Sequence, residues 1–255
     1  MNAAYFIGEP QQCGFYKVYP PKLKDVLGNP DYGVYKSILT ISQEDIWDLI
    51  AKEQSGANFS AKPIEGAPTP FEFLLNNCYH SEEYMKKAED AFQFFLHEEV
   101  KILPTVKMIV FVSSMSEDMK LEDLKKIDTE EEFFKLQNYI RYAEGEDAKE
   151  PPNPNENPRV ALIKAKGRWR ERLKAKKGSK NSIEFDRMIV ALCCMNLGLN
   201  PLNIGEISFL ACQELFAMAQ RKEQYETEIK ILTSNPFGSK KKRKPLEHWL
   251  YGKDK

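Results

Sequence analysis

The sequence predicts a mainly α-helical protein with minor β-structure, and three observations support this fold class. Apolar residues recur at steps of three and four in several segments, the longest of which begins near Phe209 and ends before Asn235. Two short segments, 5–19 and 100–112, instead carry the aromatic and β-branched residues typical of strands. The 255 residues are 42% apolar, enough for one good core or two modest ones. We therefore expect a folded chain.

A proline-rich stretch divides the chain into parts. Residues 145–158 hold four prolines among acids and asparagines, and proline has no backbone N–H to donate within a helix or a sheet. A semi-extended linker is therefore expected there. The predicted parts are an N-terminal α+β domain at 1–150, a proline-rich and then basic linker or arm at 151–182, and a C-terminal helical hairpin with a basic tail at 183–255.

The first part opens with a predicted β-hairpin. Aromatic and β-branched residues alternate over 5–19 around Gly14, and Pro20 should end the second strand because it cannot donate to a sheet. A second hairpin is expected between 100–103 and 107–112, where β-branched residues are dense.

Four helices are expected in the same part. Ser42 and Asp45 form an S-x-x-D capping box ahead of an apolar run that reaches about Lys52. Pro70 can occupy a first helical turn, where the N–H that it lacks would be unbonded. The other three patterns predict a helix over about 71–79, a widely apolar helix over 82–96, and a helix over 129–143 whose acidic first turn matches the helix dipole.

The linker ends in the most basic block of the chain. Residues 159–180 are rich in lysine and arginine and contain Glu171 as their single acid. Three interpretations stay open: a solvated helix, a flexible arm that contacts an acidic surface of an elongated protein partner, and, less favoured, a nucleic-acid site. The candidate basic patch consists of Arg168, Arg170, Arg172, Lys174, Lys176 and Lys177.

The last part contains the most patterned stretch of the chain. Ser208 can cap a long helix, and Asn235-Pro236 should stop it. The first half of this helix is expected to pack on residues 183–197, whereas its second half is either solvated or meets a partner helix. The candidate partner-binding residues are Phe216, Tyr225, Ile229 and Leu232, with Trp249 and Leu250 as a mobile anchor beyond a lysine-rich run.

No catalytic, cofactor or metal motif is recognisable in the sequence. The three histidines lie far apart, and the five cysteines lack CxxC spacing, so reduced thiols that act as small apolar groups are favoured. The N-terminus lacks the basic and apolar regions of a secretory signal, and no apolar run reaches the ~20 residues that a membrane-spanning helix needs. We expect a non-catalytic protein of the cytosol without cofactor, metal or membrane partner.

Several sequence blocks, taken in order, resemble one known family. The C-terminal part reads NPLNIGEISFLACQELF, then KEQYETEIK, then KKKRKPLEHWL, and is similar to the C-terminal signature of tail assembly chaperones from tailed phages of Gram-positive hosts. Upstream blocks such as YKSILTISQEDIWDLI and PTPFEFLLNNCYH are similar to earlier blocks of the same proteins. The family commonly carries Ala-Gly-Ala before the lysines, where this chain has residues 233–238.

The resemblance implies a role in the bacterial host cytoplasm. It implies a non-catalytic chaperone that binds and solubilises the tape-measure protein before tail-tube subunits polymerise around it, so the tail-tube protein is a second candidate partner. Self-association stays open. Two rival functions also stay open: a virion connector or tail-completion subunit, and a nucleic-acid-binding accessory protein.

Overall fold

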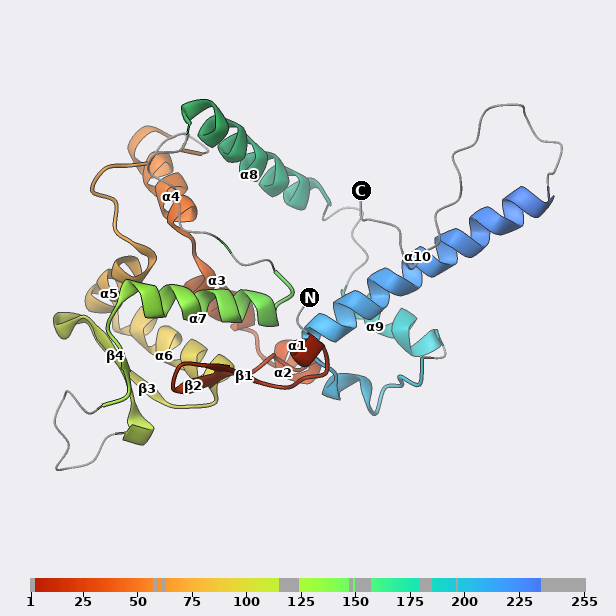
Figure 1. The fold of residues 1–255 in the computed structure, drawn as a ribbon, viewed down its shortest axis with the longest axis horizontal. Helices are drawn as coiled ribbons and strands as arrows, with labels where there is room; N and C mark the ends of the chain where they lie inside the picture. The colour runs from red at the N-terminus through yellow and green to blue at the C-terminus, as the bar shows by residue number, and fades with distance from the viewer. Residues whose placement is uncertain are drawn as a thin grey trace.

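The computed structural model describes residues 3–56, 59–60, 63–114, 124–146, 149, 157–178, 185–195 and 197–234. These residues form a mainly helical fold with two small antiparallel sheets, of two and three strands, which confirms the predicted fold class. Figure 1 shows α2 to α7 and both sheets gathered into one body, with α8 beside α4 and with α10 extending away from the body.

The N-terminal hairpin is shorter than predicted. Strand β1 (Gln11–Cys13) pairs with β2 (Tyr16–Val18), and the turn between them places Gly14 at φ 59°, a conformation that glycine adopts without steric cost. The prediction was wrong for Tyr5 and Phe6, which belong to a short helix, α1 (Ala3–Phe6). Tyr5 is fully buried there, so tertiary packing decides the conformation of this segment.

Six helices build most of the N-terminal part, and two predicted signals, the Ser42 capping box and Pro70 in a first turn, are confirmed. Ser42 and Asp45 form the predicted capping box, although the helix runs past Lys52. Thr69 and Glu72 form a second capping box with Pro70 in the first turn. The helices are α2 (Leu23–Gly28), α3 (Tyr32–Thr40), α4 (Gln43–Ser55), α5 (Pro70–His80), α6 (Glu82–Leu96) and α7 (Glu130–Ala143), of which α2 and α3 were not predicted.

The second sheet contains the predicted hairpin and one further strand. Strand β3 (Val100–Leu103) pairs with β4 (Met108–Phe111) across the 3-10 turn η1 (Pro104–Val106). All four residues of β4 are buried, and its other edge pairs with β5 (Lys126–Ile127). A second 3-10 turn, η2 (Val112–Ser114), follows β4. A strand as short as β5 has no readable period, which is why the sequence did not predict it.

The main core lies around α6. Its apolar residues Ala88, Ala91, Phe92, Phe95 and Leu96 are almost completely buried, as the wide apolar face predicted. They belong to one cluster with side chains from α5, α7 and both sheets. Each such aromatic or aliphatic side chain contributes about 1.5–3 kcal/mol by leaving water.

The basic block forms a helix, α8 (Pro158–Gly178). Arg168 of α8 pairs with Glu44 of α4. The ring centroids of Trp169 and Phe59 lie 6.1 Å apart. The described part of the predicted arm, Pro158–Gly178, is therefore helical, and most of residues 145–157 lie outside the described residues.

The C-terminal hairpin consists of α9 (Phe185–Cys194), a 3-10 turn η3 (Ile204–Glu206) and α10 (Phe209–Ser234). As predicted, Ser208 caps α10, because its Oγ accepts a hydrogen bond from the Ala211 backbone N–H at 3.1 Å. Apolar residues from the first half of α10, such as Cys212, form a second core with α9, η3 and Leu23 of α2. The predicted packing of this half of the helix on residues 183–197 is therefore confirmed.

The start of α10 is joined to the N-terminal part. Leu210 is buried in the main core, where its Cδ1 would lie 2.7 Å from a Cβ at Gly145. The Leu23 N–H donates to the Ile207 carbonyl at 2.9 Å, and the Phe209 N–H donates to the Pro21 carbonyl at 2.8 Å. The two predicted domains thus share packing and backbone hydrogen bonds.

Candidate functional site

An apolar groove runs along the middle of α10. Its apolar lining residues come from three places: Phe6 in α1, Met195 and Leu197 after α9, and Leu215, Met218 and Ala219 on α10. The groove has a volume of about 690 Å³. We call it the α10 groove. Methionine side chains are flexible and polarisable, and they suit a surface that must accept more than one apolar shape.

The rim of the α10 groove is acidic. Among the described residues, it carries Glu214, Glu223 and Glu226 against a single cation, Lys222. Lys222 pairs with Glu226 at 3.9 Å, an i,i+4 pair on the same helix. In the described part of the chain, Glu214 and Glu223 form no ion pair. The rim therefore favours a partner with basic residues beside its apolar face.

Apolar side chains continue beyond the groove towards the end of α10. Ile229 is 37% exposed and Ile231 is 59% exposed, whereas Cys212 near the start of the helix is fully buried. Figure 1 shows the C-terminal half of α10 extending away from the body. The cover that the fold gives to this helix thus decreases along its length.

The predicted partner-binding residues are not all brought together. Phe216 packs against the second core and does not line the α10 groove. Tyr225 is half-buried and Ile229 is exposed beyond the groove. The side chain of Leu232, together with Trp249 and Leu250, lies outside the described residues.

Sequence reasoning missed most of the residues that line the groove. Leu215 and Met218 lie one turn or less from Phe216 but were not among the predicted partner-binding residues. Met195 and Leu197 lie at the end of the segment 183–197, on which the helix was predicted to pack, and carry no periodic signal of their own. One sequence feature could have indicated the groove: α10 carries more apolar residues than a single buried face of a helix requires.

The side chains of the candidate basic patch do not share one environment. Arg168 points towards α4, where its guanidinium lies 3.0 Å from the Glu44 carboxylate and 3.8 Å from that of Asp48. Arg170 is exposed, as expected for a residue two positions away on a helix. The side chains of the other four lie outside the described ones: Arg172, Lys174, Lys176 and Lys177. Part of the basic block thus pairs within the molecule.

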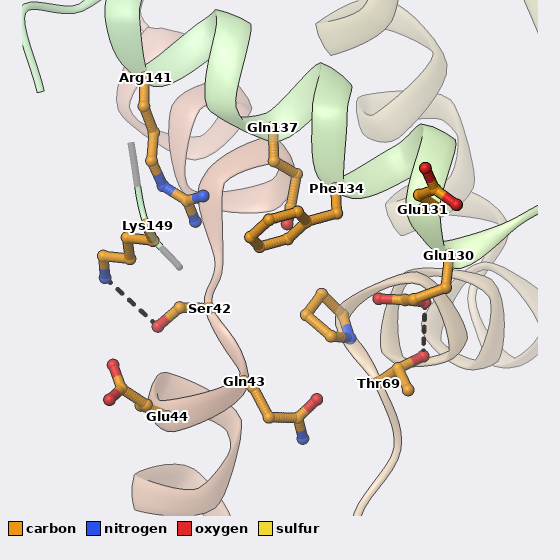
Figure 2. Close-up of a pocket in the computed structure, with 11 residues that line it drawn as sticks. Ser42, Gln43, Glu44, Thr69, Glu130, Glu131, Phe134, Gln137, Arg141 and Lys149 are labelled. Atoms are coloured by element: carbon orange, nitrogen blue, oxygen red, sulfur yellow. Dashed lines mark hydrogen bonds between the residues drawn. The ribbon is translucent and has the colours of Figure 1, made fainter. Parts of the chain in front are cut away.

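A second cavity, of about 440 Å³, lies between the N-terminal turns of α4 and α5 and one side of α7. We call it the cap pocket, because Ser42 and Thr69, the N-caps of α4 and α5, line it. Figure 2 shows Phe134, Gln137 and Arg141 pointing from α7 towards Ser42 and Gln43. No sequence pattern indicated this pocket, because its residues come from three separate helices, the residues that cap two of them, and Lys149.

Two polar side chains of the cap pocket are almost completely buried. Gln137 and Arg141 are each 1% exposed. The Arg141 guanidinium donates to the Thr40 carbonyl and, at 3.2 Å, to Asn138 Oδ1, while its Nε has no hydrogen-bond partner among the described residues. Burial lowers the pKa of Arg141. In the part of the chain that the structure describes, no carboxylate forms an ion pair with it.

The other end of the cap pocket is acidic. Glu130 accepts a hydrogen bond from the Thr69 hydroxyl at 2.7 Å, and burial raises its pKa. Glu131 pairs with Lys135 at 2.7 Å, outside the pocket. The cap pocket therefore combines apolar walls with a buried cation at one end and a partly desolvated carboxyl group at the other.

The described residues contain no group of three or more His, Cys, Asp or Glu side chains that is arranged to hold a metal ion. Among the helices described, none is both long enough and apolar enough to cross a membrane. Comparison with known proteins found no matching family model, no similar curated protein and no similar solved structure.

Proposed function

We propose that this protein is a non-catalytic phage tail assembly chaperone, which binds and solubilises the tape-measure protein in the bacterial host cytoplasm. Two kinds of observation support the proposal. The order of sequence blocks resembles that family along most of the chain. The observation that carries the mechanism is the α10 groove, an apolar and methionine-containing surface on a helix that extends away from the body.

The client is a long helical chain with apolar stripes that would otherwise aggregate. An amphipathic helix from such a chain can place its apolar face on the α10 groove, and basic residues beside that face can meet Glu214 and Glu223. Each buried client leucine contributes about 1.5–3 kcal/mol before the cost of association.

One such contact alone is weak, with a dissociation constant roughly in the micromolar to millimolar range. Several copies bound along one client add avidity and still dissociate one by one. This combination suits a factor that must leave when tail-tube subunits arrive. The tail-tube protein and further copies of this chain are therefore proposed secondary partners.

The test is co-expression of the full chain with the tape-measure gene product, followed by measurement of soluble client and pull-down. Met218→Glu places a charge in the α10 groove and should lower the soluble client several-fold. The matched control is Gln220→Glu, which places the same charge on an exposed face of the same helix. Equal solubilisation by both variants, with both correctly folded, would remove the groove from the mechanism.

The rival functions give different results in two further measurements. A connector or tail-completion subunit should be found in purified virions by mass spectrometry, whereas an assembly chaperone should be scarce there. A nucleic-acid-binding accessory protein should show salt-dependent gel shifts that Arg170→Ala weakens. Arg168 supports this last alternative poorly, because it is already engaged by Glu44 and Asp48.

A further inference from the structure

The α10 groove is complementary in charge to the basic tail of the same chain. We use this name for residues 235–255, which lie outside the described residues and contain seven lysines and arginines against two acids. Five of these cations are consecutive, at 240–244. The rim of the groove carries the opposite charge on Glu214 and Glu223, which form no ion pair with any described residue. Opposite charges arranged in this way favour and orient a contact between the two segments.

The basic tail also carries apolar residues that suit the lining of the groove. Leu246, Trp249 and Leu250 follow the run of cations at positions i, i+3 and i+4, the spacing of one face of a helix. The groove offers them the adaptable side chains of Met195 and Met218, and methionine sulfur makes favourable contacts with aromatic rings. Its volume of about 690 Å³ lies within the range of sites that accept a few large side chains.

The chain is long enough for the basic tail to reach the groove of its own molecule. Helix α10 is described as far as Ser234. From there back to Met218 the helix covers about 24 Å at the usual rise of an α-helix. The chain from Ser234 forward to Trp249 spans up to about 50 Å when it is extended. A return to the groove therefore requires no second copy of the protein.

Tethering makes even a weak contact effective. A segment joined to its binding site by a short linker has a local concentration of about 1 mM, so a contact with a dissociation constant of about 0.1 mM is occupied in roughly nine molecules of ten. We propose that the basic tail docks in the α10 groove of its own molecule and competes with the client. Trp249 and Leu250 lie against the apolar lining, and the cations at 240–244 lie along the acidic rim.

The basic tail is thus a built-in competitor for the site that the client uses, and this regulatory role rests on the proposed function. A groove that is open in about one molecule of ten binds its client about 10-fold more weakly than a groove that is always open. Docking also shields an apolar surface that would otherwise promote aggregation. In this arrangement Trp249 and Leu250 hold the groove and not the client, so their removal should strengthen client binding.

Docking is tested first without client, on the full chain, by NMR of isotope-labelled methionine methyl groups. Trp249→Ala should shift the Met218 methyl resonance, because an indole ring displaces the resonances of methyl groups beside it. The Met108 methyl resonance, from a residue buried in β4, should stay in place. Phe237→Ala removes another aromatic ring of the basic tail, outside the block at 246–250, and should shift neither resonance.

A charge reversal tests the acidic rim in the same spectra. Glu223→Lys should release the basic tail, so that Trp249→Ala no longer shifts the Met218 methyl resonance in this background. Glu228→Lys makes the same charge change at an exposed position of α10 that does not line the groove, and there the shift should persist. Added salt should weaken the shift in the wild-type background, because exposed charges are screened.

Dilution identifies which molecule supplies the basic tail. Docking within one molecule makes the Trp249-dependent shift of Met218 independent of protein concentration. A shift that disappears on dilution would assign the contact to a second copy and overturn the proposal. A Met218 resonance that is unchanged in Trp249→Ala would overturn it as well.

The client assay separates this inference from the proposed function. Trp249→Ala should raise the amount of client recovered by pull-down several-fold, and up to about 10-fold, whereas Phe237→Ala should not. Equal or lower recovery with Trp249→Ala would overturn the competition and leave the Met218→Glu test of the proposed function intact. Conversely, equal client solubilisation by Met218→Glu and Gln220→Glu would overturn the groove mechanism and leave the docking measured by NMR in place.

Discussion

Helices α6 and α10 both carry many apolar residues but receive very different cover from the fold. Around α6, α3, α5 and the second sheet enclose the helix, so that Phe92 and Phe95 are fully buried. Along α10, burial decreases from Cys212 to the exposed Ile229 and Ile231. Periodicity identifies an apolar face, but only the neighbouring elements decide whether that face becomes core or a binding surface.

The largest expected effect distinguishes the two helices directly. Phe92→Ala leaves a cavity in the main core and should lower the free energy of unfolding by about 3–5 kcal/mol. Ile231→Ala, on the exposed end of α10, should change it by less than about 0.5 kcal/mol. Urea denaturation of both variants measures the difference. Similar losses in the two would mean that the end of α10 is covered after all.

The first turn of α10 should behave like α6 and unlike the rest of its own helix. Leu210→Ala removes a side chain that is buried in the main core, and should cost about 2–5 kcal/mol. Leu202→Ala, at a leucine that is 95% exposed before the same helix, serves as control and should be near neutral. Equal losses in the free energy of unfolding for Leu210→Ala and Leu202→Ala, measured by urea denaturation, would contradict this. The contact between the two predicted domains would then contribute little to stability.

The attachment of α8 gives a smaller effect. Arg168→Ala leaves the buried Asp48 and the neighbouring Glu44 without this cation, and should cost about 1–3 kcal/mol. Limited proteolysis should then cut α8 faster, whereas Arg170→Ala at an exposed position should leave the cutting rate unchanged. Equal cutting rates for the two variants would mean that Arg168 does not hold α8 against the fold. Helix α8 would then be as weakly covered as the end of α10.

The smallest expected effect is a pH dependence at the entry to α10. Hydrogen bonds from Lys24 and Lys22 lower the pKa of Glu206 to about 2. A carboxyl group whose pKa falls on folding stabilises the folded state above its unfolded pKa, and this contribution is lost as the pH falls towards the folded pKa. Wild type should therefore melt slightly higher than Glu206→Gln at pH 7.

The same comparison at a pH near 2 provides the check. The difference in melting temperature should become smaller between the ordinary carboxyl pKa of 4.5 and about 2. Glu206, Lys22 and Lys24 are all exposed, so salt should also weaken the effect at pH 7. A difference that grew on acidification would contradict the assignment to Glu206.

Local signals predicted the elements whose ends are set by near neighbours in the chain. The Ser42 capping box, Pro70 in a first turn and the Ser208 cap all act within one helical turn, so the sequence contains the whole interaction. The short segments depended on distant partners instead. Tyr5 was predicted in a strand but lies in a helical turn, because its side chain is buried in the main core.

The sites depended on distant partners even more strongly. Arg168 belongs to a basic block by sequence, yet its partners Glu44 and Asp48 lie more than a hundred residues earlier in the chain. The cap pocket joins Ser42, Thr69 and Arg141, which share no motif. Neither arrangement leaves a period or a spacing that could be read in advance.

The sequence by itself determined the helical class, the main caps and the apolar face of α6, because backbone hydrogen bonding and side-chain periodicity act over a few residues. The tertiary structure alone decided which faces are covered. It joined the start of α10 to the main core, left a groove farther along that helix and placed Arg141 inside a cavity. Burial depends on contacts between distant segments, and those contacts exist only once the chain has folded.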